Sequence, residues 1–509
     1  MKLSIPSRNF SCEIREGETL LAALARSGVS LSAPCGGRGL CGKCGVISGG
    51  KTLLACRTIP SGDISIELPA DAIAGIQAPD LRGRTGGTET VEGRAGEAGT
   101  GKGSRAVKRI GRAGVGVDIG TTTVSAELVD LDTGETAETV SALNDQRIFG
   151  ADVMSRIEAA RKGKTAELFS LINRQIETML RSFIETYRLP KIERVSVSGN
   201  TVMLHLFANA DPSAMGEIPF TPVFLEERRF RGRGLSLSAD DVYLLPGIAA
   251  FVGGDIVSGL AVLDVLNLPD KSLFIDIGTN GEMALWSGGR VLCCSTAAGP
   301  AFEGAEISCG MGALPGAINK VTVNGESGTA GGPDGSLRFT TIDNRPPRGI
   351  CGCGLIDALA VMLKTGAIDE TGALADGFED GWPLWVSGGI GLSGRDVRQY
   401  QLAKSAIRSG ITLLCAAAGL KPGELDAVYI AGGLGFFIDL ENAIATGILP
   451  EEFRGKTAVC GNLSLRGAVL SLTRDGFAET CRRITEKSET LELASDPGFM
   501  EAFAENMLF

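Results

Sequence analysis

The chain contains very little histidine: one residue, His205, among 509. This scarcity argues against metal sites built from several histidines and against catalytic triads in which a histidine is the base. The single histidine lies in the apolar run Val202–Phe207. We therefore expect His205 to be a packed core residue rather than a catalyst.

Long apolar runs and an excess of positive charge are also lacking. No stretch approaches 18 uninterrupted apolar residues, so we expect no membrane-spanning helix. Met1 to Phe10 has no apolar core of a secretion signal. The net charge of −11 argues against a general nucleic-acid-binding protein. The 13 cysteines are an odd number and poorly spaced for a disulfide framework. We expect a soluble cytoplasmic protein.

Four cysteines near the N-terminus form the most informative pattern. Cys35, Cys41 and Cys44 are separated by five and two residues, and Cys56 follows after 11 more. Glycines between the first three let the backbone curl and direct its N–H groups at the sulfurs. Zinc sites usually contain two short Cys-x2–4-Cys pairs, whereas only one is present here. The pattern predicts a [2Fe–2S] cluster and a role in electron transfer.

The cysteines belong to a segment, residues 1–75, that we expect to form a small β-rich domain. Glu18 to Arg26 places three leucines on one helical face, and Ile64–Leu68 alternates like a strand. The composition changes abruptly from Leu81, and we assign residues 76–113 to a flexible linker, since they have too few apolar side chains to offset the entropy of ordering. Such a tether would let an electron-carrying domain move between partners; the composition fits a passive spacer equally well.

Beyond the linker, strand-like and helix-like segments alternate as in α/β proteins. Gly116–Thr123 and Phe274–Glu282 each carry Asp-Ile-Gly-Thr after an apolar strand. Glycine lets backbone N–H groups approach phosphoryl oxygens, threonine adds a hydroxyl donor, and the aspartate can hold Mg²⁺ through water. A third segment, Tyr429–Gly435, resembles the adenosine motif of the acetate kinase, sugar kinase, Hsc70 and actin superfamily. We therefore expect ATP and Mg²⁺ to bind.

Eleven residues of these segments and of an intervening glycine-rich loop are candidates for nucleotide binding. They are Asp118, Gly120, Thr121, Thr122, Gly278, Thr279, Asn280, Gly281, Gly304, Gly432 and Gly433.

Three carboxylates are candidates for catalysis. Asp276 could hold the metal ion, and Glu303, in the loop Gly299–Ala305, could orient the attacking water. Glu282 is a second candidate for that role, and for either glutamate the alternative is a solvated carboxylate. Cys351 and Cys353 stand among glycines, and we expect them to be small buried residues rather than metal ligands.

Several segments in this order resemble the reductive activators of corrinoid-dependent methyltransferases and corrinoid iron–sulfur proteins. They are Cys35–Cys44, Val117–Val124, Asn144–Val153, Ser198–Thr201, Asp276–Glu282 and Asp396–Lys404, and they span nearly the whole chain. The resemblance implies an ATP-dependent reductase. It would return inactive Co(II) of a corrinoid protein to Co(I) with one electron from the N-terminal [2Fe–2S] cluster, and so support methyl transfer.

The resemblance also implies an architecture and partners. It implies a β-grasp ferredoxin-like domain (1–75), the linker (76–113), a middle α/β domain (114–235) and an ATP-binding actin/Hsc70-like domain (236–509), the α/β part having ribonuclease H-like architecture. It makes 276–281 the better phosphate site, with 118–123 a degenerate or regulatory copy. It further implies a ferredoxin-like or flavin electron donor and a homodimer.

Three other functions remain open on the sequence. One is an ATP-driven electron-transfer activator of a different low-potential enzyme, such as a 2-hydroxyacyl-CoA dehydratase. Those activators lack a ferredoxin-like domain, so the N-terminal cysteines count against this reading. Another is a non-catalytic nucleotide-sensing ferredoxin module. The last is a small-molecule kinase, for which the cysteine-rich domain would have no use.

Overall fold

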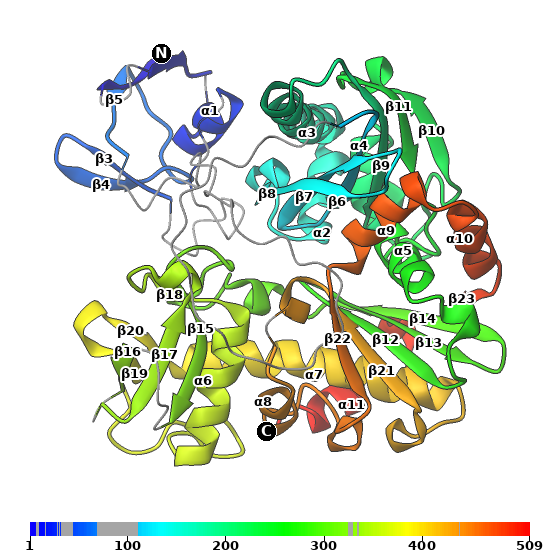
Figure 1. Cartoon of the computed structure of the whole chain (residues 1–509). Coiled ribbons are helices and arrows are strands. Elements are labelled where there is room, and N and C mark those ends of the chain that lie inside the picture. Colours follow the sequence, from blue (N-terminus) through cyan, green and yellow to red (C-terminus); the bar gives the residue numbers. More distant parts are fainter. Residues whose placement is uncertain are drawn as a thin grey trace, which may run out of the picture.

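The computed structural model describes residues 1–6, 10–15, 17–27, 29, 31, 44–68, 110–323, 329–332, 335–436 and 438–509, and the statements below concern those residues. Cys35, Cys41 and all but the last four residues of the predicted linker 76–113 lie outside these ranges. Figure 1 shows the N-terminal residues in blue, beside the part of the chain that contains the first large sheet.

The N-terminal residues form a small β-structure around one helix. Three strands pair in the order β2-β1-β5, and a separate hairpin joins β3 to β4. Their bounds are β1 (Lys2–Ile5), β2 (Phe10–Glu13), β3 (Gly45–Ser48), β4 (Lys51–Leu54), β5 (Ile64–Ser65) and α1 (Leu20–Arg26). The apolar face predicted for the helix is buried, with Leu20, Leu21 and Leu24 at most 4% exposed.

The strand predicted over Ile64–Leu68 is shorter in the structure. Strand β5 ends at Ser65, and two residues later Glu67 pairs with Ile47 of the β3–β4 hairpin. The segment passes from one sheet to the other, because its backbone groups find partners on both.

Two six-stranded sheets with matching connections form the rest of the framework. In each, a three-stranded antiparallel meander is followed by two parallel strands, so that β6, β7, β8, β9 and β11 correspond to β12, β13, β14, β21 and β22. The first sheet contains β10 (Arg228–Arg231), β11 (Ala239–Leu244), β9 (Ile192–Gly199), β6 (Ala113–Ile119), β7 (Thr123–Asp130) and β8 (Thr136–Leu143). The second contains β22 (Thr457–Gly461), β21 (Ala427–Ala431), β12 (Ser272–Ile277), β13 (Gly281–Ser287), β14 (Arg290–Thr296) and β23 (Ser488–Thr490).

Two helices cross between these sheets. Helix α5 (Gly254–Val262) follows the first sheet in sequence but packs on the second, where Gly259 lies against Phe274. Helix α9 (Leu463–Thr473) follows the second sheet but packs on β6 of the first, where Gly116 lies against Val469. A side chain at Gly467 of α9 would collide with Ser258 of α5. Glycines therefore permit the close approach that joins the two halves.

Further helices cover the sheets, and a smaller four-stranded sheet extends the C-terminal half (Figure 1). Long helix α3 (Thr165–Tyr187) packs its apolar face on the core of the first sheet. Helix α7 (Gly394–Ala417) begins at a capping box made by Ser393 and Asp396, which satisfies the backbone N–H groups of its first turn. The remaining helices are α2 (Val153–Ala159), α4 (Thr201–Phe207), α6 (Gly352–Thr365), α8 (Leu440–Ala445), α10 (Phe477–Glu486) and α11 (Phe499–Glu505). The smaller sheets contain β16 (Thr329–Gly331), β17 (Leu337–Thr341), β15 (Ala317–Val323), β18 (Gly349–Ile350), β19 (Trp382–Trp385) and β20 (Ile390–Leu392).

His205 lies in the core, as expected. It is fully buried on α4, its ring stacks on Phe224 at 4.2 Å, and both ring nitrogens have backbone partners. Burial lowers the pKa of His205 to about 4, so the ring is neutral at pH 7.

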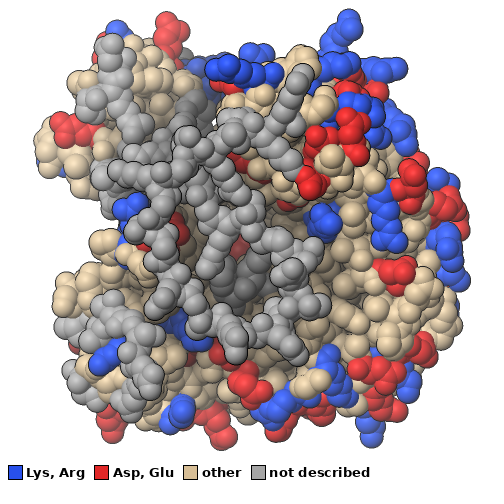
Figure 2. Space-filling model, viewed as in Figure 1, with Lys and Arg blue, Asp and Glu red and all other residues tan. Residues whose placement is uncertain are grey.

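The face of the molecule in Figure 2 is mixed in charge. Figure 2 shows basic and acidic side chains interspersed along the rim of the face in view. Within the described ranges, no helix is both long and apolar enough to span a bilayer.

Candidate nucleotide and cluster sites

The first Asp-Ile-Gly-Thr segment forms the turn between β6 and β7. Three consecutive carbonyl oxygens of this turn are held from one side. Asn144 donates its side-chain N–H to Gly120 O (2.9 Å) and its backbone N–H to Thr122 O (2.8 Å). The guanidinium of Arg156, on α2, donates to Thr121 O.

These hydrogen bonds fix the direction in which the backbone N–H groups of the turn point. In a trans peptide the carbonyl and the N–H of the next residue point in opposite directions. With the carbonyls of Gly120 and Thr121 turned towards Asn144 and Arg156, the N–H groups of Thr121 and Thr122 point away from them. A turn that presents successive N–H groups on one side is suited to bind an anion.

The second segment forms the corresponding turn between β12 and β13. Asp276 and Glu282 stand opposite each other in this antiparallel pair, and the turn is closed by the Gly278 N–H bonding to Asn280 O (2.9 Å). The Asn280 side chain donates to Glu282 (3.2 Å). Gly281 packs inside the sheet, where a side chain would press on Thr296 and Ile407.

The two turns face each other. The hydroxyl oxygens of Thr122 and Thr279 are 3.4 Å apart, although 157 positions separate them in sequence. The Glu303 carboxylate lies between them and accepts from the Thr122 hydroxyl and from the hydroxyl and N–H of Thr279. The Glu303 carboxylate thus accepts from the Thr122 and Thr279 donors that would otherwise be available to a phosphoryl oxygen.

The loop that carries Glu303 is fixed by close backbone packing. Glu303 ends the short helix η7 (Pro300–Glu303), and Gly304 follows it with φ +76°. A side chain at Gly304 would collide with the backbone of Met311. Further along, Ser308 donates its N–H (2.6 Å) and its hydroxyl (2.7 Å) to Asp396 at the start of α7.

Five carboxylates gather beneath the two turns, and four of them are sequence candidates: Asp118, Asp276, Glu282 and Glu303. The fifth, Asp255, stands in the first turn of α5. Burial, and then the neighbouring carboxylates, raise the pKa of Asp276 to about 8. Burial raises the pKa of Asp255 to about 7 and that of Glu282 well above its ordinary value. Such a concentration of negative charge favours a divalent cation.

The described residues hold no group of three or more His, Cys, Asp or Glu placed to bind a metal ion by themselves. Mg²⁺ does not require one, since it usually keeps several waters and binds through one or two carboxylates plus substrate phosphates. The donor set therefore fits a Mg²⁺ ion that arrives with a nucleotide.

Asp118 is held by two residues from much later in the chain, Asn462 and Ser464. The sequence patterns did not predict either of them. Asn462 donates to one oxygen of Asp118 (2.8 Å), and Ser464 donates to the other (2.7 Å). Ser464 also contacts Ser198 (2.9 Å) at the end of β9. Burial raises the pKa of Asp118, and these two hydrogen bonds oppose that rise.

The third motif lies beside the second turn. Gly432 follows β21 with φ +91°, and a side chain there would collide with Asp276 Oδ1 and stand 2.7 Å from Ile277 O. Gly433 is exposed, and a Cβ added there would have nothing within 4 Å. Only the first of the two glycines is thus required by close contact in this structure.

Two of the four candidate cluster ligands are described, and they are adjacent. Cys44 follows the segment 32–43, which lies outside the described residues, and Cys56 follows β4. Their sulfurs are 3.2 Å apart. Two thiolates so placed could share one metal ion, and thiolate is the usual ligand of a [2Fe–2S] cluster. By contrast, Cys351 and Cys353 are buried at the start of α6, as expected, and each thiol contacts a backbone carbonyl.

Comparisons with known proteins match the whole framework. Family models match residues 5–61 ("2Fe-2S iron-sulfur cluster binding domain"), 113–267 ("RACo middle region") and 270–509 ("C-terminal domain of RACo the ASKHA domain"). The chain is 32% identical over 430 residues to the "Corrinoid activation enzyme RamQ" of Eubacterium limosum, covering 78% of this chain and 70% of that protein. It is 31% identical over 408 residues to the "[Co(II) methylated amine-specific corrinoid protein] reductase" of Methanosarcina barkeri, covering 73% of each.

A solved structure agrees. The "Reductive activator for corrinoid,iron-sulfur protein" is 28% identical, with a TM-score of 0.72 over 100% of this chain and 98% of that one. These matches confirm the predicted fold class, a [2Fe–2S] ferredoxin domain followed by α/β domains of the ASKHA nucleotide-binding type.

Proposed function

The chain belongs to the family of reductive activators of corrinoid proteins, and from that premise we propose that it reduces the Co(II) corrinoid of a partner protein to Co(I) at the expense of ATP. One observation carries the proposal. A ferredoxin-like domain with an adjacent thiol pair shares the chain with two turns that present donors to a common point.

We place the nucleotide phosphates between the two turns. The N–H groups of Thr121 and Thr122 and the hydroxyls of Thr122 and Thr279 would donate to phosphoryl oxygens. Both Asp-Ile-Gly-Thr segments then contribute, and Glu303 must give up the donors that it holds in the structure. Released from them, its carboxylate can orient the attacking water.

The metal ion and the adenosine complete this assignment. Asp118, Asp255 and Asp276 would hold Mg²⁺ through its waters, with Glu282 behind them to complete the negative field. The segment Tyr429–Gly435, which resembles the adenosine motif, would hold the adenosine, and its Gly432 packs directly against Asp276 and Ile277 of the second turn.

The cluster would be held by Cys35, Cys41, Cys44 and Cys56. The adjacent sulfurs of Cys44 and Cys56 fit this assignment. When bound, a [2Fe–2S] cluster supplies single electrons, in plant-type ferredoxins at a potential near −400 mV. One electron moved uphill costs about 2.3 kcal/mol per 100 mV, which is within reach of nucleotide hydrolysis coupled to a change of state.

Two further elements belong to the proposal. The electron donor is a low-potential ferredoxin-like or flavin reductant, and the working form is a homodimer. Both are carried over from the family and are open to direct measurement, by reduction kinetics and by sedimentation.

The test is visible spectroscopy of a Co(II) corrinoid protein mixed anaerobically with the reduced chain, with and without ATP and Mg²⁺. We expect Co(I) only with ATP. Cys44→Ser and Cys56→Ser should abolish the cluster spectrum and the reduction. Cys12→Ser is the matched control, since Cys12 lies in the same domain on β2 and its thiol contacts Ala23 O, at 4.0 Å. An intact cluster spectrum and ATPase activity without Co(I) would refute the assigned target.

A further inference from the structure

One loop contacts both the first phosphate turn and the ferredoxin-like domain. It comprises Asn144 and the short helix η2 (Asp145–Ile148). On one side Asn144 holds the Gly120 and Thr122 carbonyls. Arg156 strengthens this side, because it bonds both Thr121 O and the Gln146 side chain (3.3 Å).

The loop is also tied to the body of its domain. The Gln146 side chain donates to Leu168 O on α3 (3.0 Å), and the Asp145 N–H bonds the Gln175 side chain (2.9 Å). Gln146 is fully buried. Hydrogen bonds therefore connect the loop both to the turn and to α3 without a break.

On its other side the loop meets the ferredoxin-like domain. The Arg147 guanidinium donates to Leu31 O (3.4 Å), and η2 packs against α1. Arg147 is only 7% exposed, and Leu31 stands four positions before the cluster-ligand candidate Cys35. Desolvation lowers the pKa of the buried Arg147, and Asp145 opposes that effect. Because the Arg147 guanidinium is buried and desolvated, loss of its hydrogen bond to Leu31 O would cost free energy.

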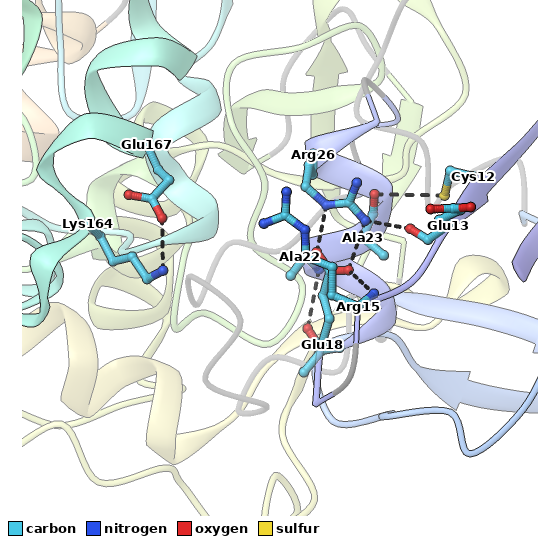
Figure 3. Close-up of polar contacts among 10 residues, drawn as sticks. Cys12, Glu13, Arg15, Glu18, Ala22, Ala23, Arg26, Lys164 and Glu167 are labelled. Carbon is cyan, nitrogen blue, oxygen red and sulfur yellow. Dashed lines mark hydrogen bonds and ion pairs between the residues drawn. The ribbon is translucent and has the colours of Figure 1, made fainter. Parts of the chain in front are cut away.

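A second pair of charges lies at the same border. Figure 3 shows Lys164 and Glu167, at the start of α3, across from α1 and from Arg15 and Glu18 before it. Glu167 bonds Lys164 at 2.9 Å, and both Lys164 and the more distant Arg15 lower the pKa of Glu167. Arg15 and Glu167 thus attract each other across the border between the ferredoxin-like domain and α3.

We propose that Arg147 positions the ferredoxin-like domain, and that it does so in response to the nucleotide. Occupation of the first phosphate turn shifts the loop that holds its carbonyls, and Arg147 passes the shift to the backbone just before the cluster ligands. The inference rests on the proposed nucleotide site but goes beyond it, since it names the residue through which the two sites communicate.

The test is hydrogen–deuterium exchange of the full chain with and without a non-hydrolysable ATP analogue and Mg²⁺. In the wild type, the analogue should change exchange in three peptides together: one over Gly120–Thr123, one over Asn144–Ile148, and one over Leu20–Leu31. In Arg147→Met, which keeps the apolar stem, the first two changes should persist while the third is lost. Arg147→Lys should restore part of it.

Arg15→Ala gives a second route that does not disturb a buried residue, because Arg15 is exposed. It should weaken the Leu20–Leu31 response without abolishing it. Arg174→Ala is the matched control: Arg174 is exposed on α3 and neighbours Asp145 electrostatically, as Arg147 does. It should leave all three responses unchanged.

A kinetic readout separates positioning from folding. In Arg147→Met, the stimulation of Co(II) reduction by ATP should fall about tenfold, the loss expected for one charge-assisted hydrogen bond, while the analogue binds within about twofold of the wild type. An unchanged Leu20–Leu31 response in Arg147→Met would overturn the inference and spare the nucleotide site. An analogue that protects none of the three peptides would overturn both.

Discussion

Replacing Asp255 with asparagine should stabilise the protein and disable it. Asp255 is one of five carboxylates crowded below the phosphate turns, and its charge raises the pKa values of Asp276 and Glu282. Asparagine keeps the oxygen that accepts from the Ile256 N–H at 2.9 Å. The substitution therefore removes a buried charge with little change of shape.

The magnitude follows from linkage. The pKa of Asp255 rises from 3.8 to about 7 on folding. A carboxyl whose pKa is higher in the folded state binds more protons there between those values, so the free energy of unfolding falls as pH rises through that window. At about 1.4 kcal/mol per unit, the full penalty at pH 8 is about 4 kcal/mol. Relaxation and water reduce it, and we expect a measured gain of about 1–2 kcal/mol.

The assay is thermal unfolding at pH 5 and pH 8 without divalent cations. Asp255→Asn should melt higher at pH 8, by about 2–4 °C per kcal/mol, and the gain should shrink at pH 5. With ATP and Mg²⁺ the order should reverse, because the variant loses a proposed Mg²⁺ ligand. Asp426→Asn, an exposed substitution in the same part of the chain, is the control. A variant no more stable than the wild type at pH 8, or equally stabilised at both pH values, would refute the electrostatic account.

Two other predictions concern single residues. Gly432→Ala should abolish ATPase activity, because the new methyl group collides with Asp276 in a backbone conformation that favours glycine. Gly433→Ala should retain the activity, and comparable ATPase rates of the two variants would contradict the proposed role of Asp276. The imidazole NMR signal of His205, the only histidine, should not titrate between pH 8 and pH 5, since the pKa of His205 is lowered to about 4. The stability that His205 contributes should be lost as pH falls from 6.5 towards 4. An NMR titration midpoint near pH 6.5 would show that the ring is solvated.

The sequence patterns predicted those features of the structure that depend on residues close together in the chain. The leucine spacing of α1 gave its buried face, and each Asp-Ile-Gly-Thr segment formed a turn after an apolar strand. The family resemblance that these motifs carry predicted the fold class, which the comparisons confirm. The buried position of His205 followed from its apolar neighbours.

The rest of the candidate site depends on contacts between distant segments. Asn462 reaches Asp118 across 344 positions, and Arg156 reaches Thr121 from a different helix. No periodicity in the sequence encodes such pairs. Asp255 did carry a signal, because it follows Gly253 and Gly254 at a helix start, yet glycine pairs are common in this chain. Strand β5 is shorter than predicted because the residues after it pair with the β3–β4 hairpin, and that pairing exists only in the folded chain.

The crossing of α5 and α9 has a consequence for synthesis. The first sheet is complete by Leu244, but the helix that covers β6 is α9, which begins at Leu463. A ribosome therefore releases the first sheet with the face that meets α9 uncovered, where β6 and β9 present the small residues Gly114, Gly116, Ser196 and Ser198. More than 200 further residues must follow before α9 can cover that face. Truncation before α9 should consequently expose the face of a sheet encoded in the first half of the gene.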